Sequence, residues 1–217
     1  MQEHHAYGKH RSKPALVSIT QCTEYGTVYN IDELRSIRSI CTELGLLLHI
    51  DCCRVYNAAA YLDCSLADIT SKIGADIISL GGTKIGCMLA ESVVIFNPDL
   101  YQDAEYIQKN TLQLYSKNRF LACQYVALFE NELWRDLAKH QNQIAKTIES
   151  KLLGLGFKTT QKVESNHLFV EVKPELANKL ENAGLCYIWP GEGSQVRLVT
   201  SFDSNEDDIE ALISNLK

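Results

Sequence analysis

Short apolar runs alternate with amphipathic stretches through the first half of the chain, and this alternation constrains the fold more than any other feature. The expected strands occupy residues 15–20, 46–53, 76–80 and 92–96, and the expected helices occupy residues 31–44 and the segment through 58–60. Strands that take turns with helices predict an α/β fold with a mostly parallel sheet. The near-continuous apolar runs predict that this sheet is covered on both faces.

The second half of the chain changes character after Pro98. Residues 99–154 show helical spacing with few breakers and predict at least two helices. Shorter runs then predict a small α+β domain, with strands at 157–160, 167–172, 185–189 and 196–202, a helix at 174–183 and a closing helix. Asp203 or Ser204 is expected to cap that closing helix, and the acidic run after it suits the helix dipole.

These patterns divide the chain into a polar N-terminal arm at 1–14, a larger domain at 15–138 and a smaller domain at 139–217. The arm carries His4, His5 and His10, for which a solvated arm is favoured over a metal site. No metal site is predicted.

Composition excludes several classes of protein. Of the 217 residues, 46% are hydrophobic, and 21 Lys and Arg stand against 27 Asp and Glu, giving a formal charge of −6. Without a long basic run, nucleic acid is not an expected partner. The sequence shows no run of eighteen apolar residues and no secretory signal, so neither a membrane nor secretion is expected, and the predicted location is the cytoplasm.

The eight cysteines are scattered and do not form the two spaced CxxC pairs of a structural zinc site. They are interpreted as reduced, mostly buried thiols, which fits a reducing compartment.

Chemistry-bearing residues follow the expected strands. Thr23 and Glu24 follow the first, Asp51 and Arg54 the second, and Lys84 the third. Because the carboxyl ends of parallel strands meet at one edge of a sheet, an acid, a guanidinium and an amine are expected to converge there.

Each of these residues also has a purely structural interpretation. Asp51 could cap a helix, Arg54 could form a surface ion pair, and Lys84 could be solvated. Together they fit pyridoxal phosphate chemistry, in which a lysine forms a Schiff base and a carboxylate keeps the ring nitrogen protonated. The chain contains no GxxxxGK[ST], GxGxxG, GxSxG or HExxH, so the common nucleotide, hydrolase and metalloprotease motifs are absent.

Four segments, in this order, resemble the low-specificity L-threonine aldolases, members of the β-eliminating lyase group with the type I pyridoxal phosphate fold. They are 14–29 (PALVSITQCTEYGTVY), 49–57 (HIDCCRVYN), 79–86 (SLGGTKIG) and 112–120 (LQLYSKNRF). The similarity runs from about Lys13 to the C-terminus, and the order of the motifs is more specific than any one of them.

The resemblance implies a role for each matching residue. Lys84 would form the Schiff base with the cofactor, Asp51 would pair with its ring nitrogen, and Thr83 would reach its phosphate. Arg54 would contact the cofactor hydroxyl oxygen or the substrate carboxylate, and Arg197 would hold the α-carboxylate of the amino acid substrate, a bidentate task.

The resemblance further implies that Thr23 and Glu24 lie beside the substrate. Lys117 and Arg119 would reach a neighbouring subunit of a homodimer or homotetramer. The implied reaction is the retro-aldol cleavage of a β-hydroxy-α-amino acid, such as threonine or allo-threonine, to glycine and an aldehyde.

The chain departs from the family pattern at three positions. Cys52 and Cys53 stand where the family usually has Gly-Ala, and Ile85 stands where it usually has Asn. An added side chain costs little if the backbone φ is negative, and buried filler is favoured over a strained vicinal disulfide.

Family members also begin with a segment that this chain is expected to lack. That segment holds the phosphate-cradling loop and a histidine that stacks on the cofactor ring. Two hypotheses follow: a pyridoxal phosphate lyase, or a catalytically incompetent C-terminal fragment that could assemble with a separate N-terminal fragment.

Overall fold

The computed structural model describes residues 12–191 and 195–216, so the histidines of the expected N-terminal arm lie outside the described residues. The strands are β1 (Leu16–Thr20), β2 (Leu47–Asp51), β3 (Ile77–Gly81), β4 (Glu91–Ile95), β5 (Lys158–Thr159), β6 (His167–Glu171), β7 (Tyr187–Trp189) and β8 (Gln195–Val199). The α-helices are α2 (Ile31–Glu43), α3 (Val55–Leu62), α4 (Ala104–Asn110), α5 (Arg119–Phe129), α6 (Leu133–Gly154), α7 (Pro174–Asn182) and α8 (Glu206–Asn215). Short 3-10 helices include η2 (Leu66–Ile69), η3 (Ser71–Ile73) and η4 (Thr83–Ile85).

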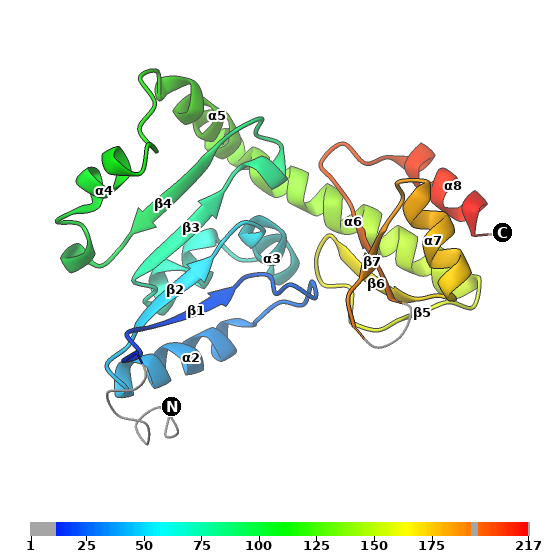
Figure 1. Cartoon of the computed structure of the whole chain (residues 1–217), viewed down its shortest axis with the longest axis horizontal. Helices are drawn as coiled ribbons and strands as arrows, with labels where there is room; N and C mark the ends of the chain where they lie inside the picture. Colours follow the sequence, from blue (N-terminus) through cyan, green and yellow to red (C-terminus); the bar gives the residue numbers. More distant parts are fainter. Residues whose placement is uncertain (1–11, 192–194, 217) are drawn as a thin grey trace.

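The first sheet has the strand order β1-β2-β3-β4 (Figure 1). The β1–β2 and β2–β3 pairs are parallel, and β4 is antiparallel to β3. The parallel pairs follow from the crossovers: α2 connects β1 to β2, and α3 with two 3-10 helices connects β2 to β3. The expected α/β fold with a mostly parallel sheet is confirmed.

One face of this sheet packs on helices. Leu48 and Ile50 of β2 and Ile78 of β3 are buried there in one core with residues of α2, α3, α5 and α6. On the opposite face, Leu16 is 42% exposed and Val93 62% exposed. The prediction of a sheet covered on both faces is therefore wrong for the residues described.

The reason is a polar row at alternate strand positions. Ser18 Oγ lies 2.7 Å from His49 Nδ1, and His49 Nε2 lies 3.0 Å from Ser79 Oγ. Since side chains alternate between the two faces of a strand, these residues lie on the face away from the helices. Polar residues thus interrupt the apolar runs at the strand positions that no helix covers.

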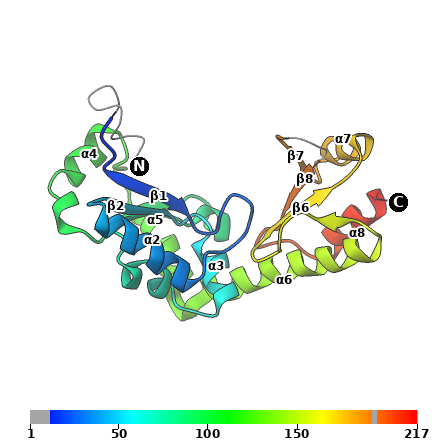
Figure 2. The same cartoon turned by 90° about the horizontal axis from the view of Figure 1, so that it is seen from below.

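The second sheet, of order β5-β6-β8-β7, is antiparallel throughout. Its apolar face packs on α6, α7 and α8 through side chains that include Leu168, Val170, Val196 and Leu198. Helix α6 joins the two parts of the molecule (Figure 2). The expected domain division at residue 138 falls inside this helix.

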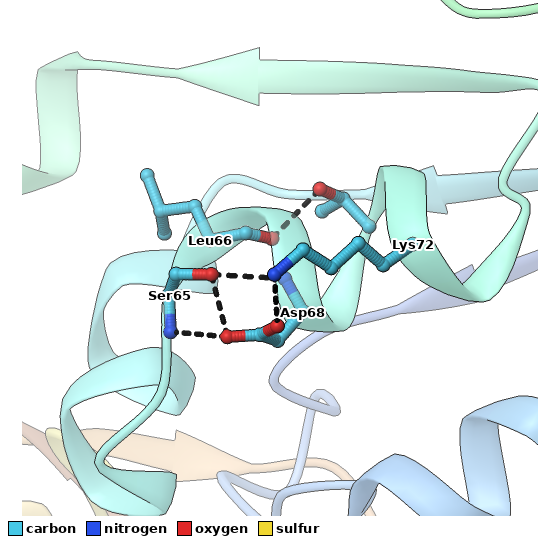
Figure 3. Close-up of polar contacts among 5 residues, drawn as sticks. Ser65, Leu66, Asp68 and Lys72 are labelled. Atoms are coloured by element: carbon cyan, nitrogen blue, oxygen red, sulfur yellow. Dashed lines mark hydrogen bonds and ion pairs between the residues drawn. The ribbon is translucent and has the colours of Figure 1, made fainter.

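The connection between α3 and β3 contains a polar cluster at a 3-10 turn (Figure 3). Ser65 N and Ser65 Oγ donate to Asp68 Oδ2 at 2.9 and 2.5 Å, while Lys72 Nζ pairs with Asp68 Oδ1 at 2.7 Å. Thr70 Oγ1 donates to the carbonyl of Leu66 at 2.7 Å. Hydrogen bonds from Lys72 and Ser65 lower the pKa of the Asp68 carboxyl. This surface cluster shapes the turn that leads into β3.

The closing helix is capped one residue later than expected. Neither Asp203 nor Ser204 is the cap; Asn205 Oδ1 accepts from Asp207 N and Asp208 N at 2.8 and 3.4 Å. The Ser204 hydroxyl instead accepts from Ser201 N at 2.9 Å and shapes the preceding turn. The prediction was wrong because three polar residues in a row all have N-cap chemistry, and the turn decides which one is used.

Candidate active site

The three parallel strands end side by side at the candidate site. Thr20, Asp51 and Ser79 are aligned in register on β1, β2 and β3. Asp51 closes its strand, and its Oδ1 accepts from the backbone N of Cys53 at 3.0 Å. The carboxylate is thereby anchored at the mouth of the turn that leads to α3, whose N-cap is Arg54.

Lys84 lies in η4, three residues beyond the end of β3, and is exposed. The two glycines before it allow close backbone packing. A Cβ on Gly81 would lie 2.8 Å from Glu91 Oε2, and one on Gly82 would lie 2.9 Å from the carbonyl of Ala90. The carbonyl of Lys84 accepts from Gln141 Nε2 at 3.0 Å, which ties this loop to α6.

Cys53 lies beside the Asp51 carboxylate, to which its backbone N donates. Burial and the neighbouring Asp51 together raise the pKa of the Cys53 thiol to about 11, with Lys84 acting in the opposite direction. Cys53 is only partly buried, so the buried-filler interpretation does not describe it.

Cys52, by contrast, is fully buried in the core and does fit the filler interpretation. Both thiols are free, so no vicinal disulfide forms. Neither cysteine has a positive φ, which shows that the turn needs no glycine at these positions. Ile85 is also buried, and the apolar side chain at this position belongs to the core.

The two arginines come from different parts of the chain: Arg54 is the N-cap of α3, and Arg197 lies on β8. Burial lowers the pKa of Arg54, and the nearby positive charge of Arg197 on β8 lowers it further. Arg197 Nη2 lies 3.3 Å from His167 Nε2 and 4.0 Å from Glu24 Oε2. The Arg197 guanidinium also lies 5.0 Å from the ring centre of Trp189.

His167 is a residue of this site that the sequence analysis did not single out. Burial lowers the pKa of its imidazole to about 2, and the positive charges of Arg54, Arg197 and Lys84 contribute to the shift. Of these three cations, Arg197 is in direct contact with His167. The alternation of side chains along a strand offered a signal for His167. Residues 167 and 169 lie on one face of β6, and Arg197 of β8 is paired with Phe169, so His167 and Arg197 lie on the same face of the sheet.

The remaining predicted site residues lie in different surroundings. The Thr23 hydroxyl bonds to that of Thr27 at 2.7 Å within its own loop, and Glu24 is exposed beside Arg197. Thr83 is exposed, and its backbone N donates to Glu91 Oε1 at 3.4 Å. Arg119 begins α5 and Lys117 lies two residues before it; both are exposed, and α5 lies away from strands β5, β6 and β7 of the second sheet (Figure 1).

Several buried polar atoms of the site have no hydrogen-bond partner among the described residues: Arg54 Nε, Arg197 Nε and His167 Nδ1. No ion pair joins Lys84 to a described residue either. Buried polar groups are ordinarily satisfied, so the two unpaired guanidinium atoms fit a site that binds a polar group. An amine, a carboxylate and two guanidinium groups fit an anionic carbonyl cofactor together with a carboxylate substrate.

In the described part of the chain, no group of three or more His, Cys, Asp and Glu is arranged to hold a metal ion. Within residues 12–191 and 195–216, no helix is both long and apolar enough to cross a membrane.

The fold and the site together define an α/β protein with charged side chains at the carboxyl ends of a mostly parallel sheet. A sequence profile of the beta-eliminating lyases matches residues 2–175, so the chain belongs to the beta-eliminating lyase family. It is 38% identical over 210 residues to a low specificity L-threonine aldolase of Pseudomonas sp., and 37% identical to that of Pseudomonas aeruginosa. Each alignment covers 96% of this chain and 60% of the relative.

A solved structure of Leishmania major threonine aldolase superposes with a TM-score of 0.88 at 30% identity. This superposition covers 96% of the present chain and 62% of that one. The chain thus spans about 60% of the length of the curated relatives it matches.

Proposed function

We propose that this chain is part of a pyridoxal phosphate-dependent carbon–carbon lyase that cleaves β-hydroxy-α-amino acids. The observation that carries the proposal is the placement of charged groups at the carboxyl ends of the parallel strands. Asp51 ends β2 in register with β3, which leads directly into Lys84, while Arg197 of the second sheet lies 4.0 Å from Glu24 on the loop after β1. Membership of the beta-eliminating lyase family supports the same conclusion.

Four residues would hold the cofactor. The Lys84 amine would bond to its carbonyl carbon, and the Asp51 carboxylate would hold a proton on its ring nitrogen. Thr83 would donate to its phosphate, and Arg54 would contact its hydroxyl oxygen or the substrate carboxylate. When bound, pyridoxal phosphate supplies a ring that accepts the electron pair released by carbon–carbon cleavage.

Residues on the second sheet and on the loop after β1 would bind the substrate. Arg197 would hold the α-carboxylate through paired N–H donors, with Thr23 and Glu24 beside the substrate. The products of threonine or allo-threonine would be glycine and an aldehyde. By the resemblance, Lys117 and Arg119 would contribute to a neighbouring subunit of a homodimer or homotetramer, and the free thiols favour a reducing compartment such as the cytoplasm.

The test begins with a titration of the purified chain with pyridoxal phosphate, followed by borohydride reduction and peptide mass analysis. A visible absorbance band and a reduced adduct on Lys84 are expected. Lys84→Ala should remove both, together with glycine formation from threonine, whereas Lys151→Ala, on an exposed part of α6, should change neither. An adduct distributed equally over surface lysines would contradict the assignment of Lys84.

A second candidate is a fragment that is inactive alone and assembles with a separate N-terminal segment. The open face of the β1–β4 sheet favours it, because Leu16 and Val93 remain exposed there. The corresponding test mixes this chain with the N-terminal part of the Pseudomonas aeruginosa relative. Threonine cleavage that appears only in the mixture, and is lost with Lys84→Ala, would support assembly; full activity of the chain alone would exclude this candidate.

A further inference from the structure

His167 lies at the start of β6 in direct contact with Arg197, and it is 1% exposed. The loop after β1 covers it closely: a Cβ on Gly26 would lie only 2.5 Å from His167 Cβ. Gly26 has a φ of +76°, and its carbonyl accepts from Ser165 Oγ at 2.8 Å. Since the imidazole is enclosed by β6, β8 and this loop, it has no route to a reacting atom of a substrate.

The contact with Arg197 determines which imidazole nitrogen carries the proton. A guanidinium has only N–H donors, so His167 Nε2 must accept from Arg197 Nη2 at 3.3 Å. In a neutral imidazole the proton then resides on Nδ1. Nδ1 is buried, and the backbone of Glu24 is the group that acts on the imidazole as a hydrogen-bond acceptor, an effect that by itself raises the His167 pKa.

We propose that His167 is a positioning residue that aims the Arg197 guanidinium at the substrate carboxylate without cancelling its positive charge. This inference rests on the carboxylate role proposed for Arg197. A neutral acceptor fixes the direction of one Nη2–H and leaves the full cationic charge for the ligand. A carboxylate in the same place would form an ion pair and compete with the substrate.

The surrounding charges keep the imidazole neutral. The positive charges of Arg54 at the N-cap of α3, Arg197 on β8 and Lys84 in η4 all oppose protonation of the imidazole. Burial of the imidazole has the same effect. Arg197 also forms an ion pair with Glu24, whose Oε2 lies 4.0 Å from Arg197 Nη2 and whose side chain is 61% exposed. Solvent screens that exposed pair, so Glu24 neutralises Arg197 only weakly.

Four variants separate orientation from charge, and the probe is glycine added to the full chain without pyridoxal phosphate. His167→Gln can place an amide oxygen near the Nε2 position, His167→Phe keeps the ring without an acceptor, and His167→Glu adds a charge. Arg197→Ala removes the guanidinium that is proposed to bind the glycine carboxylate. Affinity is measured by NMR titration, and folding of each variant is checked by thermal unfolding.

We expect His167→Phe to weaken glycine binding about ten-fold, the effect of losing one well-oriented charged hydrogen bond. His167→Gln should remain within about two-fold of wild type, and His167→Glu should bind more weakly than His167→Phe. Equal affinity of the wild type, His167→Phe and His167→Glu variants would overturn the proposal. If His167→Phe does not fold, the comparison of His167→Gln with His167→Glu still decides between orientation and no role.

Nitrogen NMR of the wild-type imidazole provides a measurement that needs no ligand. A neutral Nδ1–H tautomer that does not change between about pH 5 and 8 is expected, given an ordinary histidine pKa of about 6.5. An Nε2–H tautomer or a charged imidazole would overturn the proposal. Failure of Lys84 to react with pyridoxal phosphate would instead contradict the proposed function, so the two failures are distinguishable.

Discussion

The two sheets contribute to the candidate site in different ways. The β1–β4 sheet supplies residues at and beyond its strand ends, with Asp51 as the last residue of β2 and Lys84 just after β3. The β5–β8 sheet supplies residues from one of its faces, where Arg197 and His167 come from paired strands. A turn at a strand end leaves the direction of a side chain to the loop that follows, whereas a strand face fixes that direction through its register.

If this contrast is functional, residues of the first sheet set the rate and residues of the second set the affinity for substrate. The largest effect is expected from Asp51→Asn. Loss of the charge at the ring nitrogen should lower kcat by about 1000-fold, or roughly 4 kcal/mol of activation free energy. Steady-state threonine cleavage measures it, in whichever preparation is active, and Asp103→Asn on the exposed segment before α4 is the control. A kcat near the wild-type value would remove Asp51 from the chemistry.

The stability of the two parts should be comparable, because each has its own buried core. Leu48→Ala in the first and Leu168→Ala in the second should each lower the free energy of unfolding by about 2–5 kcal/mol. Urea denaturation monitored by circular dichroism measures both. Unfolding of only one part in either variant would show that α6 does not couple the two cores.

Arg197→Lys tests the affinity side of the comparison. Lysine keeps the charge but not the paired donors or the contact with His167, so KM should rise about ten-fold or more with a smaller change in kcat. Lys173→Arg, a swap of the same pair of residue types in the reverse direction outside the site, is the control. A fall in kcat with an unchanged KM would place Arg197 in the chemistry instead.

The loss of folding stability at low pH should depend on Asp76, which lies at the opposite end of the first sheet, directly before β3. Burial alone would raise the pKa of Asp76, but hydrogen bonds from Leu48 N, Asn97 Nδ2 and Arg38 outweigh it and lower the pKa from its ordinary value of 3.8. A carboxyl with a lowered folded-state pKa contributes stability above that ordinary value, and the contribution is lost as the pH falls through its folded-state pKa.

Asp76→Asn should therefore lower stability at pH 7 by about 1–2 kcal/mol and reduce the loss of stability below about pH 4. Thermal unfolding measured from pH 7 down to about pH 3 gives both quantities. Identical pH profiles for the variant and the wild type would contradict this account of Asp76.

The smallest effect is expected on the open face of the first sheet. Val93 is 62% exposed, and threonine has the same shape and β-propensity, so Val93→Thr should change the unfolding free energy of the isolated chain by less than about 0.5 kcal/mol. Urea denaturation measures it. A loss of more than about 1 kcal/mol would mean that this face is covered in solution, for instance by a second copy or by an N-terminal segment.

Much of the fold was predictable from local patterns. The alternating apolar and amphipathic runs correctly indicated the order of strands and helices, since each pattern reflects which side chains a strand or helix must bury. Boundaries were less accurate: β8 ends at Val199, before the expected end at residue 202, because the chain turns there. The open face of the first sheet was missed because Ser18, His49 and Ser79 interrupt the apolar runs only at alternate positions.

The candidate site was predictable in part. Asp51, Arg54 and Lys84 follow strands, so parallel pairing alone indicated that they would converge. Cys53 and His167 carried a weaker signal, because a cysteine in a turn and a histidine in an apolar run both resemble core residues. The place of His167 beside Arg197 depends on the pairing of β6 with β8, two strands that lie far apart in the sequence.

The amino-acid sequence by itself determined the succession of elements, the reactive residues at the strand ends and the family to which the chain belongs. Only the tertiary structure decided that Arg197 contacts His167 on the paired strand, and that burial with nearby positive charges keeps this histidine uncharged. The physical reason is that periodicity is a local property of the chain, whereas desolvation and charge proximity depend on groups distant in sequence that packing brings within a few ångströms.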